Sequence, residues 1–159
     1  MKKVILIITV ILLTSCSATQ KTIISAKKTL KGEWSLDKIS YDRSGVFDVL
    51  LYNDVSAECL TGGIWKFIPN NNTGIYTVND TQCTSTGARN FRFTIPEPSS
   101  NGEYSFLFKP INEKKKSTNN NKGYRMTLQH LDETTMTWTQ AVTLEGKPFM
   151  IIMNFNKIQ

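Results

Sequence analysis

The sequence predicts an all-β fold, an eight-stranded antiparallel up-and-down β-barrel, from two observations. From Gly63 onward, short segments of alternating apolar and polar residues are separated by turn residues such as Asn101-Gly102 and Glu145-Gly146. No segment there has a helical apolar period long enough for the crossover that parallel strands need. Such a meander closes best by pairing its last strand with its first, which removes the exposed edges. A flat or sandwiched sheet is the alternative fold.

The chain begins with a segment typical of an export signal. Lys2 and Lys3 form a basic start, and residues 4–13 are an apolar run too short to span a bilayer as a helix. The next motif, Leu13-Thr14-Ser15-Cys16, resembles the lipobox of bacterial lipoproteins. That resemblance implies that residues 1–15 are a signal peptide that is removed, and that Cys16 is acylated, with palmitate among its chains, as the membrane anchor. The alternative is an ordinary secreted protein cut near Ser15 or Ala18.

Two regions follow the anchor. Residues 16–29 are rich in Ser, Thr and Lys and predict a lipidated N-terminus with a flexible tether. Residues 30–159 form the barrel domain. We expect a monomer in the cell envelope, anchored by its lipid in the outer membrane. The formal net charge is +6, part of which leaves with Lys2 and Lys3, and the rest is interpreted as a mild excess spread over the domain.

Three cysteines are present, and Cys16 is assigned to the lipid. The remaining pair, Cys59 and Cys83, predicts a disulfide in an exported protein. It would close a loop of about 25 residues and stabilise the fold by about 3–4 kcal/mol. Free thiols in redox or metal chemistry are the alternative, but neither cysteine belongs to a Cys-x-x-Cys pair.

The strands are read from alternation between turn signals. Trp34 and Leu36 alternate with polar neighbours in the first strand, and Phe91, Phe93 and Ile95 do so near the middle of the chain. The Asn-rich stretch 70–74 predicts a hairpin turn. The predicted strands lie near residues 32–41, 63–69, 74–79, 89–95, 103–109, 124–131, 135–144 and 148–158.

Two loops stand out. Residues 41–60 are the least regular part and predict a long first loop with a short helix across one end of the barrel. An apolar cluster within it is interpreted either as a lid or as an exposed patch; its members are Phe47, Leu50, Leu51 and Tyr52. Residues 112–123 contain three consecutive lysines and predict a solvated hairpin loop. They are a poor nucleic-acid patch because no aromatic residues are interleaved with the lysines.

A family resemblance rests on the first strand together with the preceding features. Gly32-Glu33-Trp34, preceded by Leu30, resembles the G-x-W opening of the lipocalin superfamily. With the lipobox, the strand meander and a cysteine pair around the second hairpin, the chain is similar to small lipocalin-like bacterial lipoproteins. This implies a calyx on a lipid anchor that binds or carries a small hydrophobic ligand, with Trp34 closing one end of the barrel.

Candidate ligand-binding residues are the side chains predicted to face inward. They are Trp65, Phe67, Phe91, Phe93, Phe106, Phe108, Met126, Leu128, Trp138 and Gln140. The fold alone justifies burying the apolar ones, so they equally describe a filled core. Gln140 is the polar member, and it is interpreted either as pointing at a ligand or buried water, or as a barrel-mouth residue facing solvent.

No enzyme, cofactor or metal site is predicted. His130 is the only histidine and ends a strand beside a turn, and the carboxylates are scattered over turns and strand ends. Two functions are therefore expected. The first is a membrane-anchored carrier of a small hydrophobic ligand, which predicts a cavity open at one end. The second is a filled barrel that acts through its loops as an envelope assembly partner or inhibitor.

Overall fold

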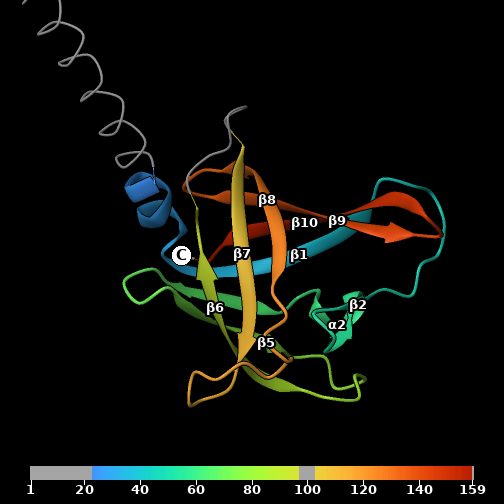
Figure 1. Cartoon of the computed structure of the whole chain (residues 1–159), viewed down its shortest axis with the longest axis horizontal. Coiled ribbons are helices and arrows are strands. Elements are labelled where there is room, and N and C mark those ends of the chain that lie inside the picture. The colour runs from blue at the N-terminus through green and yellow to red at the C-terminus, as the bar shows by residue number, and fades with distance from the viewer. Residues whose placement is uncertain (1–22, 97–102, 159) are drawn as a thin grey trace, which may run out of the picture.

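The computed structural model describes residues 23–96 and 103–158, so the predicted signal peptide and Cys16 lie outside the described residues. Eight long strands are present in these ranges: β1 (Gly32–Tyr41), β4 (Ile64–Ile68), β5 (Thr73–Val78), β6 (Gly87–Thr94), β7 (Tyr104–Ile111), β8 (Tyr124–Leu131), β9 (Thr135–Leu144) and β10 (Lys147–Lys157). They form a closed antiparallel barrel in the order β1-β10-β9-β8-β7-β6-β5-β4 (Figure 1). The predicted barrel is confirmed, and each strand boundary lies within two residues of its prediction.

Alternating side chains explain these strands. In β5, Gly74, Tyr76 and Val78 are buried, whereas the residues between them are partly exposed. Gly74 has a packing role, because a Cβ at that position would lie 2.2 Å from a ring carbon of Phe91 and 2.5 Å from the carbonyl oxygen of Lys66. The missing side chain therefore lets an aromatic ring of the neighbouring strand lie against the backbone.

The register is irregular at two places. It shifts between Leu36 and Lys38 in β1 and between Leu128 and His130 in β8. Such bulges increase local twist and turn later side chains to a new direction. In β8, Met126 is buried, Leu128 is half-buried and His130 is exposed. The side chains of the last residues of β8 therefore no longer point into the core.

A helical segment covers one end of the barrel. Residues 23–30 are helical, and Lys27 Nζ donates a hydrogen bond of 3.1 Å to Asn72 Oδ1 in the β4–β5 turn. The predicted flexible tether is therefore helical over its described part, residues 23–29. None of the helices in the described ranges has both the length and the apolarity that a membrane crossing requires.

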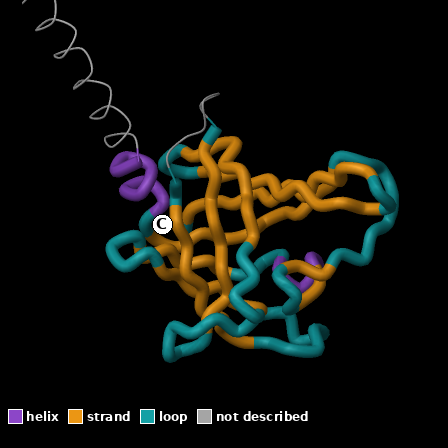
Figure 2. The backbone as a smooth tube through the Cα atoms, in the orientation of Figure 1, coloured by secondary structure: helices purple, strands orange, loops and turns teal. Residues whose placement is uncertain are grey.

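The first long loop covers the opposite end, which we call the mouth. It holds a small sheet of β2 (Leu50–Leu51) and β3 (Val55–Ser56), followed by helix α2 (Ala57–Leu60). We call residues 50–60 the lid, and Figure 2 shows its helix below the long β9–β10 hairpin. The short helix was predicted, but the β2–β3 sheet was not. The predicted disulfide is confirmed: Cys59 of the lid is bonded to Cys83 in the loop between β5 and β6.

Candidate functional site

The candidate ligand-binding residues lie in the barrel, and most are fully buried. The exposed fraction is at most 1% for the candidates Trp65, Phe67, Phe91, Phe93, Phe106, Phe108, Met126 and Trp138. Leu128 is half-buried and lines a shallow hollow of about 280 Å³ against the helix of residues 23–30. Trp34 is fully buried, and its indole Nε1 donates to the Leu30 carbonyl oxygen at 2.9 Å.

The buried rings pack on one another. Trp65 lies near the middle of this cluster, with its ring centroid 4.8 Å from that of Tyr76 and 5.7 Å from that of Trp138. Phe106 lies 4.6 Å from Trp138 and 5.0 Å from Phe93. Such distances are those of rings in direct contact. The candidate residues therefore face each other and fill this part of the barrel.

Three buried polar atoms have no hydrogen-bond partner among the described residues. They are the indole Nε1 atoms of Trp65 and Trp138 and the amide Oε1 of Gln140. Gln140 is 8% exposed, so its side chain is inside rather than at the surface. A buried polar atom without a partner costs about 1–3 kcal/mol, which a bound water or a ligand group would offset. Two donors and one acceptor are therefore unpaired within the packed interior.

Tyr52 of the lid enters the barrel from the mouth, and we call its ring the plug. The ring centroid is 4.4 Å from that of Phe108 and 5.2 Å from that of Tyr124. Its hydroxyl lies 3.4 Å from the Sδ atoms of Met126 and Met153, and thioethers are weak acceptors. Burial, the largest cause, raises the pKa of Tyr52 well above its ordinary value, so the hydroxyl stays protonated.

The backbone at Tyr52, which carries the plug, is strained. Tyr52 and Asn53 have φ angles of 54° and 58°, two consecutive residues in the left-handed region. Asn tolerates this region, whereas for a bulky aromatic residue it costs about 1–2 kcal/mol. The lid therefore holds the ring in the barrel with an unfavourable backbone and a poorly bonded hydroxyl.

A hollow of about 290 Å³ with both polar and apolar walls lies at the mouth beside the plug. Asp54 organises it: its Oδ2 accepts from the Tyr76 hydroxyl at 2.7 Å and pairs with Arg89 Nε at 3.0 Å. Burial first, and then the bond to Asp54, raise the pKa of Tyr76. Asn119 and Ile111 complete the other side of the hollow. The mouth thus has fixed polar groups above an aromatic floor.

The apolar cluster of the first loop divides between its two predicted roles. Leu51 and Tyr52 are buried as part of the lid. Phe47 packs on Tyr41 and Phe149 at the base of the β9–β10 hairpin, with its ring centroid 5.2 Å and 4.9 Å from theirs. Leu50 is 61% exposed and lines an open groove of about 550 Å³ between this loop and the β9–β10 hairpin. The cluster is therefore both a lid and an exposed patch.

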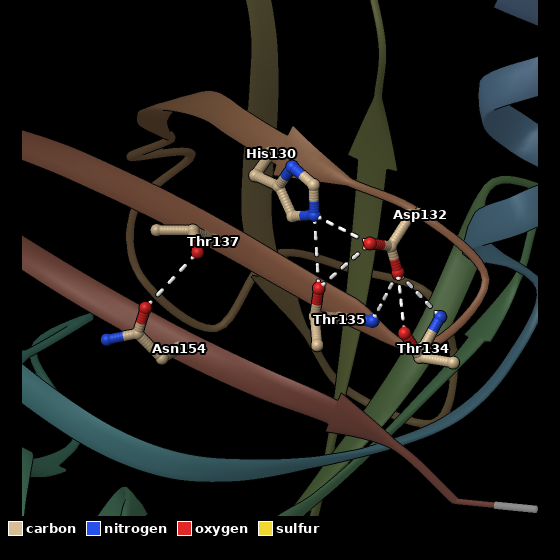
Figure 3. A network of polar contacts seen from close by, with 6 residues as sticks. All are labelled: His130, Asp132, Thr134, Thr135, Thr137 and Asn154. Atoms are coloured by element: carbon tan, nitrogen blue, oxygen red, sulfur yellow. Dashed lines mark hydrogen bonds and ion pairs between the residues drawn. The ribbon is translucent and has the colours of Figure 1, made fainter.

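His130 lies in a polar network that has the residue types of a catalytic triad (Figure 3). Its Nε2 lies 2.8 Å from Asp132 Oδ2 and 3.0 Å from Thr135 Oγ1. Both partners thus share one ring nitrogen, whereas a triad needs the acid on one nitrogen and the nucleophile on the other. Asp132 Oδ1 also accepts the backbone N–H groups of Thr134 and Thr135, both at 2.7 Å. The network is a capped turn at the surface.

Sequence reasoning did not find Asp54 or Arg89. Both are ordinary charged residues in irregular or strand-end positions, 35 residues apart, and they meet only because the lid lies over the mouth. Tyr52 was noticed only as a member of the apolar cluster. Its strained backbone and its place between two methionines have no local sequence signal.

Comparisons with known proteins gave fold-level similarity alone. No family model matches the chain. No curated protein matches it either. Solved structures of odorant-binding protein from bovine nasal mucosa match at 12% identity with a TM-score of 0.43, over 82% of this chain and 72% of theirs. Bovine odorant-binding protein with a selenium-containing odorant matches at 12% identity and a TM-score of 0.42, over 84% and 73%. Similarity at this level says nothing of what this chain binds.

Proposed function

We propose that this chain is a lipid-anchored, non-enzymatic barrel of the cell envelope that binds a small, largely apolar molecule beneath the lid. The observation that carries the proposal is the plug. Tyr52 comes from the lid, yet its ring occupies the barrel interior on a strained backbone. A guest of similar size would replace it and contact the same rings and methionine sulfurs.

The surroundings of the plug fit such a guest. Apolar walls with a few fixed polar groups are typical of small-molecule sites. Met126 and Met153 are unbranched and polarisable, so they adapt to different shapes. The mouth hollow adds about 290 Å³ next to the plug, where Asp54, Tyr76 and Arg89 would orient a polar end of the guest. The sequence predicted a carrier with a cavity open at one end. We propose instead a carrier in which the Tyr52 ring fills the binding position until a guest replaces it.

Binding to the Tyr52→Ala variant tests this proposal. Only molecules with an open lid can bind the guest. If these make up about 0.1–10% of the wild type, its apparent affinity for the guest is about 10- to 1,000-fold weaker than that of the open form. Tyr52→Ala removes the plug and should bind the guest more tightly by that factor. The measurement is a titration of residues 17–159 with the neutral fluorophore N-phenyl-1-naphthylamine, together with mass spectrometry of molecules extracted by organic solvent. Phe47→Ala is the matched control, because the Phe47 ring comes from the same loop but packs on Tyr41 and Phe149 rather than on the rings around Tyr52. Equal affinities for the wild type and Tyr52→Ala would refute the plug.

The membrane anchor is tested separately. We expect Cys16→Ser to move the protein from the membrane fraction to the soluble fraction, because two or more acyl chains are what hold such a protein on a bilayer. Metabolic labelling with an alkyne analogue of palmitate should mark the wild type and not the variant. Labelling of both would assign the lipid elsewhere and contradict the anchor at Cys16.

The second candidate function, action through the outside of the barrel, is favoured by the packed aromatic interior. If no guest binds and Tyr52→Ala only loses stability, the side chains themselves fill the barrel. Recognition would then rest on the outer surface.

A further inference from the structure

The positive charge of this chain is concentrated in one segment rather than spread over the domain. Residues 87–125 hold eight of the nineteen Lys and Arg residues but three of the thirteen Asp and Glu residues. This segment therefore carries nearly all of the formal net charge of +6, and the remainder of the chain is close to neutral. The sequence-based interpretation of an evenly spread excess is wrong.

Three of these cations lie on the outer face of neighbouring strands. Arg92 of β6 is the direct register partner of Lys109 of β7, and Leu107 is the partner of Arg125 in β8. Inward residues such as Phe93 and Met126 alternate with them, so the cations lie on the outer surface. Figure 1 shows β6, β7 and β8 side by side. Like charges placed directly opposite each other destabilise a sheet unless an anion lies between them.

The loop between β7 and β8 adds two more cations. Asn112 Oδ1 accepts from the Lys116 backbone N–H at 3.0 Å, and Ser117 Oγ accepts from the Asn121 backbone N–H at 3.0 Å. Ile111 and Ser117 form an isolated antiparallel bridge. The loop thus folds back on the end of β7, and Lys115 and Lys116 face the same hollow as the strand cations.

Together these residues line two adjoining hollows, which we call the cationic groove. The first hollow, of about 490 Å³, is lined by Arg92, Lys109, Lys115 and Lys116, and its other polar side chains are Ser, Thr and Asn. The second, of about 460 Å³, shares Arg92 and Lys109 and adds Arg125. No Asp or Glu of the described residues lines either hollow.

The floor of the second hollow differs from that of the first. Leu107 lies there beside the cations, on the outer face of β7. Tyr124 also belongs to the lining, but its ring faces the barrel interior beside Phe108. Lys122 Nζ lies 5.8 Å from the centroid of the Tyr124 ring. The groove therefore combines cations, hydroxyl and amide groups, and an apolar face along one elongated depression.

We propose that the cationic groove binds an acidic oligosaccharide. Its carboxylate, sulfate or phosphate groups would pair with Arg92, Lys109 and the two loop lysines, since charge-assisted hydrogen bonds are the strong ones. Sugar hydroxyls match the Ser, Thr and Asn groups, and the apolar face of a sugar ring fits over Leu107. A membrane surface is flat, whereas the cationic groove is concave and is lined by amide and hydroxyl groups as well as cations, which favours a saccharide chain. The groove adjoins the mouth, since Ile111 and Thr118 line both hollows. The groove variants described below leave Tyr52 unchanged, so this proposal can fail separately from that of the plug.

The test is isothermal titration calorimetry of the full mature chain in a nonionic detergent. The probes are a heparin-derived hexasaccharide, oligogalacturonate and uncharged maltohexaose. We expect the two acidic saccharides to bind and maltohexaose not to bind. Affinity should fall with salt at a logarithmic slope of about −3, since each contacted anion releases close to one counterion. Absence of binding by both acidic saccharides, or equal binding of maltohexaose, would overturn the proposal.

Two double variants locate the site, and a third serves as their control. Arg92→Gln with Lys109→Gln, and Lys115→Gln with Lys116→Gln, should each lower the affinity at least tenfold. Lys38→Gln with Lys147→Gln removes the same charge from exposed positions elsewhere and should change affinity less than threefold. A similar loss in the control variant would mean non-specific attraction and refute the groove. The Lys115 and Lys116 pair is fully on the surface, so it also serves if the strand variant unfolds.

Two further ligands distinguish the competing partners. Vesicles containing phosphatidylglycerol and an oligoglutamate peptide are titrated under the same conditions. Weaker binding of both than of the acidic saccharides supports the proposal. Tighter binding of either one, abolished by the groove variants, would overturn it and assign the groove to a lipid surface or an acidic peptide.

Discussion

Replacing Tyr52 by Phe removes one hydroxyl from the barrel interior, and we expect the protein to become more stable. The hydroxyl is fully buried, and its partners are the Sδ atoms of Met126 and Met153, both at 3.4 Å. A buried hydroxyl without a good partner costs about 1–3 kcal/mol, and two weak thioether contacts offset only part of that. The expected gain for Tyr52→Phe is therefore about 0.5–1.5 kcal/mol.

Tyr76→Phe is the matched control, with the opposite sign. Its hydroxyl donates to the Asp54 carboxylate at 2.7 Å, and a hydrogen bond to a charged group contributes about 1.5–3 kcal/mol. Both variants delete one oxygen from a tyrosine near the mouth. Urea unfolding compares their midpoints, provided that the m-value stays constant. A gain of 1 kcal/mol would raise Tm by about 3 °C in a domain of this size.

A loss of stability in Tyr52→Phe larger than about 1 kcal/mol would refute this reasoning. It would mean that the hydroxyl has a strong partner, such as a buried water, and that the plug is held firmly. Displacement of the ring by a guest would then be much less favourable. Equal losses in both variants would lead to the same conclusion.

Three further predictions concern the ends and turns of the barrel. Trp34→Phe should lower the free energy of unfolding by about 1–3 kcal/mol in urea, because the Leu30 carbonyl loses its buried donor. Breaking the disulfide with Cys59→Ser and Cys83→Ser together should lower it by about 3–4 kcal/mol, and an unchanged midpoint would exclude the loop-closure effect. Backbone N–H groups lower the pKa of Asp132 below its ordinary value of 3.8, so its contribution is present above that pH and lost as pH falls below it. The Tm of wild type should therefore exceed that of Asp132→Asn at pH 7, and the difference should shrink between pH 4 and pH 2.

The strands could be predicted because their information is local. Alternation in 89–95 or 135–144 states which side chains face inward, and turn residues mark where each segment ends. Barrel closure was favoured over a flat or sandwiched sheet, because pairing the last strand of a meander with its first removes the exposed edges. The first loop was predicted less well, since a two-residue strand such as Leu50–Leu51 has too few positions to show a period.

The candidate site was predicted in part for the same reason. Inward-facing residues such as Trp138 could be named, but whether they enclose space depends on volumes and rotamers that no pattern encodes. Asp54 and Arg89 meet only where the lid lies against the start of β6, so their pairing is a property of the tertiary structure. The excess of Lys and Arg in residues 87–125 can be counted from the sequence. That these cations line one groove follows only from the structure, in which β6, β7 and β8 are neighbours.

The disulfide at Cys59 has a consequence for how strongly any guest must bind. Tyr52 is held seven residues from this fixed point, so an expelled ring stays within about 25 Å of its place in the barrel. Over a short flexible connection, such a ring competes as if it were present at millimolar concentration. A guest therefore occupies the barrel only when the product of its concentration and its affinity exceeds that of the tethered Tyr52 ring. Reducing the disulfide would lengthen the connection and lower the effective concentration of the Tyr52 ring. The barrel would then bind a guest at lower guest concentrations.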